Sequence, residues 1–296
     1  MKSMKIKNVI IYLISLLILV AIVIFTLNVV QGKISDINTL IIFGVSFIFV
    51  MTTLGSAIVF FFKDKIEERL NKVFLGFASG VMIAASVWSL ILPAIEQSKD
   101  LNIPEYLPAA VGFIFGGLFL LLLDKIIPHF HSEINQEEGV KSNFKRSTKL
   151  FLAVTLHNIP EGLSVGLGFG LGLVYNSPAL ISAGVGLALG IGLQNLPEGA
   201  AVALPLKEAT GSNLKGFLYG TLSGLVEPIF AILGMILATK VVSIMPWALS
   251  FAAGAMIYVV VEELIPEAHL GEHSHYGTWA VMIGFVIMMI LDVALG

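Results

Sequence analysis

The chain has 296 residues, of which 57% are hydrophobic and 12% charged, with a net charge of −3 and no cysteine. Soluble domains carry about 25% charged residues, so a water-soluble fold is excluded. The lack of cysteine excludes disulfides, thiolate zinc sites and cysteine nucleophiles, and the lack of a dense basic tract excludes a nucleic-acid partner. Any bound metal ion must be held by nitrogen and oxygen.

Apolar runs follow one another along the chain, each with the roughly 20 residues that a helix needs to cross a bilayer. The runs are continuous rather than alternating in polarity, which favours helices over transmembrane strands. We therefore predict an all-α, polytopic helical membrane protein. The predicted spans are residues 8–30, 39–62, 73–95, 107–128, 149–174, 178–205, 214–238, 244–267 and 276–295.

Two parts are expected: an extra N-terminal helix with a short loop (1–38) and a core (39–296). We interpret the first span as a retained anchor, because its apolar stretch exceeds that of a signal peptide. Lys and Arg near short loops tend to stay in the cytoplasm. With the N-terminus placed in the cytoplasm, only three of the 17 Lys and Arg residues lie outside: Lys33, Lys99 and Lys240. The C-terminus is then extracytoplasmic, the polar segment 129–148 is a mobile cytoplasmic loop, and the plasma (inner) membrane is the expected location.

Two neighbouring spans carry the same polar motif. An ionisable side chain inside a span costs about 2.5–3.5 kcal/mol on insertion scales, so each needs a partner or a function. His157 and Glu161 are four residues apart, as are Gln194 and Glu198, so each pair shares one helix face. In both motifs a proline precedes the glutamate and a glycine follows it.

These prolines lie in the middle of otherwise helical patterns. Pro160 and Pro197 cannot bond the carbonyls of Leu156 and Leu193, so both helices are predicted to kink there. Such breaks are tolerated at membrane depth when they line a polar cavity. The repeated motif is typical of symmetry-related elements that meet at a central site.

The residue types indicate a divalent-metal site. Imidazole and carboxylate suit zinc and its first-row neighbours, and amide oxygens add weaker donors. Glu227, followed by Pro228, gives a third helix the same carboxylate-and-proline character. The set fits one ion, or two ions bridged by shared carboxylates. The predicted metal ligands are His157, Asn158, Glu161, Gln194, Asn195, Glu198 and Glu227.

For other polar residues, the sequence leaves open whether they have a role at the metal site. Glu262, Glu263 and Asp292 lie in spans and either serve the site or make buried hydrogen bonds. Loop histidines either receive ions or are simply solvated. They are His129, His131, His269, His273 and His275. The glycine-rich runs 166–172 and 184–192 are predicted to be close-packing surfaces between helices.

With these residues, the chain resembles the ZIP family of zinc and iron transporters, particularly its GufA-like prokaryotic branch, from about residue 40 to the end. The resemblance rests on the two P-E-G motifs and on further segments that follow in order. They are T-T-L-G-S at Thr52, A-A-S-V-W-S-L-I-L-P-A-I-E at Ala84, V-E-P at Val226, V-E-E-L-I-P-E-A-H at Val261 and L-D-V-A-L-G at Leu291.

The resemblance implies an eight-helix core, preceded here by the extra helix, and uptake of divalent metal toward the cytosol. It also implies two adjoining ion positions bridged by Glu161 and Glu198. His157 and Gln194 would complete the first, and Asn158, Asn195 and Glu227 the second. Relatives often carry histidine where this chain has Glu262, and some carry aspartate where it has Asn195.

We therefore expect a carrier, with no enzymatic activity and no catalytic cofactor, that moves Zn²⁺ or a related ion such as Fe²⁺, Mn²⁺ or Cd²⁺. A metal channel and a proton-coupled transporter of an organic solute are the alternatives. An intramembrane metalloprotease would need H-E-x-x-H, which the sequence does not contain. The expected partners are the divalent ion and the lipid bilayer, and a homodimer is left open.

Overall fold

The chain is described by a computed structural model that covers residues 17–18, 20–21, 23–29, 31–61, 67–99, 101–131, 136–141, 144–269 and 275–295. Within these ranges, 8 helical spans are long and apolar enough to cross a membrane. They are Ile37–Phe60, Arg69–Ser98, Tyr106–Ile126, Ser147–Val174, Pro178–Thr210, Asn213–Lys240, Val242–Ala268 and Tyr276–Leu295.

These spans confirm the predicted all-α, multi-spanning fold, since they coincide with the second to ninth predicted spans to within a few residues. The first predicted span, 8–30, lies partly outside the described residues, because 8–16, 19, 22 and 30 fall there. What is described of it, from 17 to 29, is helical.

Several spans are built from more than one helical element. The elements in chain order are α2 (Ile37–Ser56), η1 (Ala57–Phe60), α3 (Glu68–Ala85), η2 (Ser86–Ile91), α4 (Leu92–Ser98), α5 (Tyr106–Ile126), β1 (His129–His131), β2 (Gln136–Glu138), α6 (Arg146–Val174), α7 (Pro178–Thr210), α8 (Asn213–Gly224), α9 (Val226–Lys240), η3 (Val242–Ile244), α10 (Met245–Val259), η4 (Val260–Leu264), α11 (Ile265–His269) and α12 (Tyr276–Leu295).

Two of these spans contain a π-helical turn just before a proline. The π-turn η2 is followed by Pro93, and η4 is followed by Pro266. Proline lacks an N–H, so it cannot bond the carbonyl four residues earlier, and a widened turn is one way for the helix to continue. The turn η4 carries Glu262 and Glu263.

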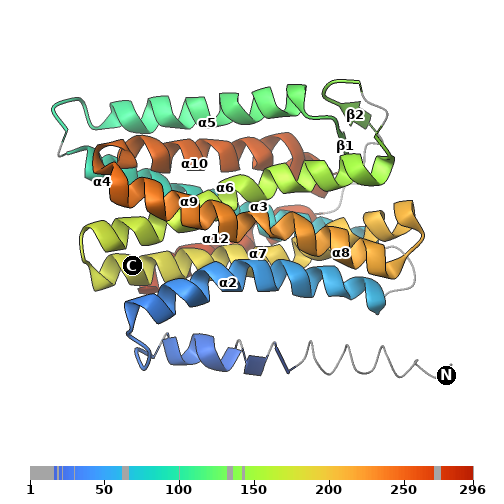
Figure 1. Cartoon of the computed structure of the whole chain (residues 1–296), viewed down its shortest axis with the longest axis horizontal. Helices are drawn as coiled ribbons and strands as arrows, with labels where there is room; N and C mark the ends of the chain where they lie inside the picture. The colour runs from blue at the N-terminus through green and yellow to red at the C-terminus, as the bar shows by residue number, and fades with distance from the viewer. Residues whose placement is uncertain are drawn as a thin grey trace.

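The long helices run side by side along the longest axis of the molecule (Figure 1). Helix α2 packs on α7, and α6 packs on α9 and α7, while α3 packs on α12 and α5 on α10. The spans of α7 and α10 are the most enclosed, each with 67% of its apolar window buried, against 17% for α12. The span of α6 is also largely enclosed, with 62% buried, so most residues of α6 and α7 are surrounded by protein.

The polar segment 129–148 contains secondary structure. Strands β1 and β2 form an antiparallel pair in which His129 faces Glu138 and His131 faces Gln136. Helix α6 then begins at Arg146. Residues 132–135 and 142–143 lie outside the described part of the chain.

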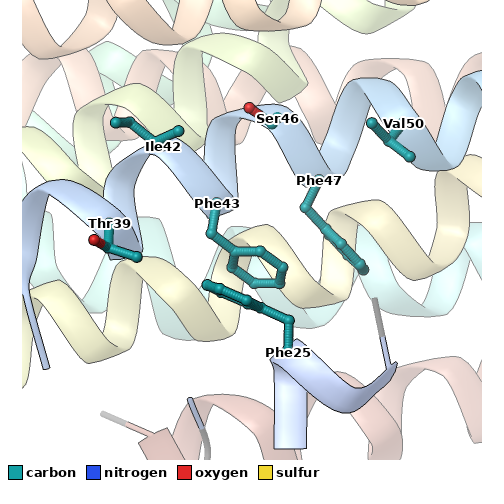
Figure 2. Close-up of a pocket in the computed structure, with 7 residues that line it drawn as sticks. All are labelled: Phe25, Thr39, Ile42, Phe43, Ser46, Phe47 and Val50. Atoms are coloured by element: carbon teal, nitrogen blue, oxygen red, sulfur yellow. The ribbon is translucent and has the colours of Figure 1, made fainter. Parts of the chain in front are cut away.

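The N-terminal helical segment contacts α2 through aromatic rings. Phe25 lies 4.5 Å from Phe43, centroid to centroid, and Phe43 lies 5.3 Å from Phe47. Figure 2 shows these rings at a pocket of about 390 Å³, whose lining also includes Thr39, Ile42, Ser46 and Val50. The segment therefore covers part of one face of α2.

Glycines allow the helix pairs to approach closely. A Cβ on Gly116 of α5 would overlap the carbonyl oxygen of Phe251 in α10, and one on Gly254 would overlap that of Phe113. In the two glycine-rich runs, a Cβ on Gly166 would overlap the carbonyl oxygen of Ala231 in α9, and one on Gly192 would overlap the ring of Phe47 in α2. The prediction that these runs are packing surfaces is confirmed.

We predict that Gly116→Ala lowers the free energy of unfolding by about 1–3 kcal/mol, the usual cost of overpacking, because α5 and α10 must separate. The adjacent Gly117 is the matched control, since a Cβ there would find its nearest neighbour at 3.9 Å. Thermal unfolding in detergent measures both variants. Equal unfolding temperatures for the two would contradict the packing argument.

Candidate metal centre

Two helices carry six of the seven predicted ligands. His157, Asn158 and Glu161 lie on α6, and Gln194, Asn195 and Glu198 lie on α7. All six side chains are buried. Both helices continue through their internal prolines, Pro160 and Pro197.

The glycine of each motif brings a further helix to the site. A Cβ on Gly162 would overlap the backbone carbonyl of Glu227, and one on Gly199 would overlap that of Thr52. Any larger residue would therefore push α9 away from α6, or α2 away from α7. The two glycines place Glu227 and Thr52 beside the motif glutamates.

Glu227, the seventh predicted ligand, is fully buried in the first turn of α9 and uses both carboxylate oxygens. Thr52 Oγ1 donates to Oε1 at 2.8 Å, and Asn195 Nδ2 donates to Oε2 at 2.8 Å. The Asn195 Oδ1 atom in turn accepts from Gln194 Nε2 at 2.7 Å. These bonds join α2, α7 and α9 into one polar network.

Several oxygens at the centre have no hydrogen-bond donor among the described residues. They are both carboxylate oxygens of Glu161, Oε2 of Glu198 and Oε1 of Gln194. The amide nitrogen of Asn158 is unpaired as well. Buried polar atoms are nearly always bonded, so a cluster of unpaired acceptors requires an explanation, of which an ion is one.

The three glutamates also interact with one another. The carboxylate of Glu161 interacts electrostatically with those of Glu198 and Glu227, and the amide of Gln194 lies beside both Glu161 and Glu198. Like charges brought together in a medium of low dielectric constant repel strongly. A divalent cation among them would turn that repulsion into attraction.

His157 contacts Glu263, a residue that the sequence analysis left with two interpretations and without a predicted partner. Its Nε2 lies 2.7 Å from Oε1 of Glu263, and both side chains are about 9% exposed. An imidazole that donates from Nε2 keeps the lone pair of Nδ1 for a metal ion, and metal-binding histidines usually donate their other ring N–H to a carboxylate in this way. Glu262 is exposed instead, so the two adjacent glutamates point to different surroundings.

Two more residues at the centre were not predicted from sequence. Asp124 of α5 is buried and interacts with His157 and Tyr258. Thr52 belongs to the T-T-L-G-S segment, which the sequence analysis used only for the family resemblance. A carboxylate near a span end and a threonine within an apolar run are weak signals, because both are common in membrane helices.

The centre is not a compact cluster of charged ligands. Among the described residues, no group of three or more His, Cys, Asp or Glu is arranged to surround an ion. His157 is turned to Glu263 and Glu227 to Thr52 and Asn195, so the side chains bond one another. Amide oxygens of Gln194 and Asn195 lie between the carboxylates and would have to contribute.

The remaining candidates lie apart from this network. Asp292 of α12 accepts a hydrogen bond from Ser89 of η2, and its second oxygen has no partner in the part of the chain that the structure describes. His129 and His131 lie in β1, His269 ends α11, and His275 is exposed just before α12. His273 lies outside the described residues.

The fold and the centre define a multi-pass helical membrane protein with a buried nitrogen- and oxygen-rich polar site. The family model for ZIP Zinc transporter matches residues 38–149 and 138–292. The chain therefore belongs to the ZIP family.

Relatives of known name support this assignment. The zinc transporter ZIP11 of Homo sapiens is 34% identical over 90% of this chain and 99% of its own length. The zinc transporter GufA of Myxococcus xanthus is 39% identical over 75% of this chain and 86% of its own length. The zinc transporter ZIPB of Bordetella bronchiseptica is 34% identical over 84% of this chain and 79% of its own length.

We predict that Glu263→Ala destabilises the protein by about 1.5–3 kcal/mol, the typical worth of a hydrogen bond to a charged group, because it leaves buried His157 without its acceptor. Glu262→Ala is the matched control from the neighbouring, exposed position. Detergent unfolding curves measure both. If Glu262→Ala costs as much as Glu263→Ala, the His157–Glu263 contact is not a stabilising one.

Proposed function

We propose that this chain carries Zn²⁺ or a related divalent ion across the membrane through the buried centre on α6, α7 and α9. The observation that carries the proposal is the set of unpaired oxygens of Glu161, Glu198 and Gln194. All are acceptors, and they come from the neighbouring helices α6 and α7, an arrangement that suits a cation. The names of the relatives favour zinc among divalent ions.

Two adjoining ion positions fit the residues. In the first, His157, Glu161, Gln194 and Glu198 supply one nitrogen donor and three oxygen donors, two from carboxylates and one from an amide, a mixture that zinc accepts. In the second, Asn158, Asn195 and Glu227 join the same two glutamates. Glu161 and Glu198 would then bridge, so each neutralises part of the charge of two ions.

The ligand types also suit release. No thiolate is available, and nitrogen and oxygen ligands hold zinc-like ions less permanently than sulfur does. A transported ion must leave the site as well as enter it, so moderate affinity favours turnover. We propose movement toward the cytosol, which the resemblance to the family implies. The distribution of Lys and Arg supports an orientation with the N-terminus inside and the C-terminus outside.

Glu161→Ala and Glu198→Ala are each expected to abolish zinc uptake, because each removes a ligand shared by two ions and unbalances the remaining charges. Uptake is measured with purified protein in liposomes that enclose a zinc-sensitive dye. Glu105→Ala, outside the predicted spans and exposed, is the control and should transport normally. Zinc transport at the control rate in either centre variant would refute the bridging roles.

His157→Ala is expected to change which ion is preferred rather than to stop transport entirely. It removes the one nitrogen ligand and leaves an oxygen-only site, which favours Mn²⁺ relative to Zn²⁺. Competition of Mn²⁺ against Zn²⁺ uptake in the same liposomes measures the preference. An unchanged ratio would mean that the imidazole is not a ligand.

A further inference from the structure

Thr52 stands at the junction of three helices beside the second ion position. It is a buried residue of α2, and its backbone carbonyl lies where a side chain on Gly199 would have to go. Its methyl group fills the space beside Gly224, since a Cβ on Gly224 would lie 2.7 Å from it. The position of the side chain is therefore fixed on two sides.

The Thr52 hydroxyl has two acceptors within reach. One is Oε1 of Glu227 at 2.8 Å, and the other is the backbone carbonyl of Ile48 at 3.2 Å. A hydroxyl has one hydrogen to donate, and bonds to a charged acceptor are shorter and stronger than bonds to a neutral one. The carboxylate of Glu227 is thus the acceptor.

The two hydrogen bonds on Glu227 differ in how easily an ion can replace them. Asn195, which donates to Oε2, is itself a predicted ligand, so a rotation of its amide that brings its oxygen to an ion would release Oε2. Thr52 is not a ligand in this scheme, and its hydrogen bond keeps Oε1 directed to α2. Glu227 then offers one oxygen, Oε2, to the ion.

We propose that Thr52 is a positioning residue that limits Glu227 to one metal-binding oxygen and thereby sets the preference for Zn²⁺ over ions that take more oxygen ligands. The inference rests on the proposed function, in which Glu227 is a ligand. Zinc is held by about four ligands, whereas Mn²⁺ favours oxygen-rich octahedral sites. Freeing Oε1 would let Glu227 bind through both oxygens and would favour Mn²⁺.

The test separates the hydroxyl of Thr52 from its methyl. Thr52→Val keeps the shape and the contact with Gly224 but removes the donor, while Thr52→Ser keeps the donor and removes the methyl. Thr53→Val is the matched control, because the Thr53 hydroxyl donates to the carbonyl of Phe49 on its own helix at 2.9 Å. Zn²⁺ and Mn²⁺ uptake by each variant is measured in proteoliposomes, with KM and Vmax determined separately.

We expect Thr52→Val to raise KM for Zn²⁺ about 10-fold or more, as the loss of a hydrogen bond to a metal ligand commonly does, and to raise the ratio of Mn²⁺ to Zn²⁺ uptake. Thr52→Ser and Thr53→Val should both behave as the unaltered protein. Impairment of Thr52→Ser equal to that of Thr52→Val would show that packing, not the hydroxyl, matters and would overturn the proposal. An unaltered KM and ion ratio in Thr52→Val would overturn it as well.

A Glu227→Gln background separates this inference from the function on which it rests. If Glu227→Gln alters KM for Zn²⁺, adding Thr52→Val should change nothing further, because the group that Thr52 positions has gone. An additional loss in the double variant overturns the role of Thr52 and leaves Glu227 a ligand. A normal KM in Glu227→Gln alone overturns the second ion position itself, whatever Thr52→Val does.

Discussion

The arrangement of the whole centre follows from the cost of holding three interacting carboxylates inside a membrane. Each of Glu161, Glu198 and Glu227 is fully or almost fully buried, and the charge of each raises the energy of the others. The insertion cost of about 2.5–3.5 kcal/mol per ionised group must be offset by donors or by a cation. Thr52 and Asn195 supply donors to Glu227, whereas Glu161 has none among the described residues.

The three residues of the P-E-G motif act together to accommodate the buried carboxylates. The glutamate supplies the charge, and the proline before it leaves the carbonyl of Leu156 or Leu193 without its usual helical donor. The glycine after it admits the backbone of a neighbouring helix, α9 at Gly162 and α2 at Gly199. Four helices therefore converge at one depth, although only two of them carry the motif.

Hydrophobic run length was enough to predict eight of the spans, and the four-residue spacing was enough to predict which faces of α6 and α7 are polar. The partners of those faces were not predictable. Thr52 and Glu227 are 175 positions apart in sequence, so no local pattern links them. Adjacent Glu262 and Glu263 look alike in the sequence, and only the packing of the α10–η4–α11 segment separates an exposed one from the one that meets His157.

The ring contact between Phe25 and Phe43 has a consequence for how the N-terminal segment is held on α2 (Figure 2). Lipid tails are as apolar as phenylalanine, so inside a bilayer the hydrophobic effect does not drive the two together. Shape and dispersion forces alone decide whether Phe25 or an acyl chain occupies that groove. In the predicted topology, in which this segment crosses the bilayer, it competes with lipid for one face of α2, and close packing of rings such as Phe25 on Phe43 is what would hold it there.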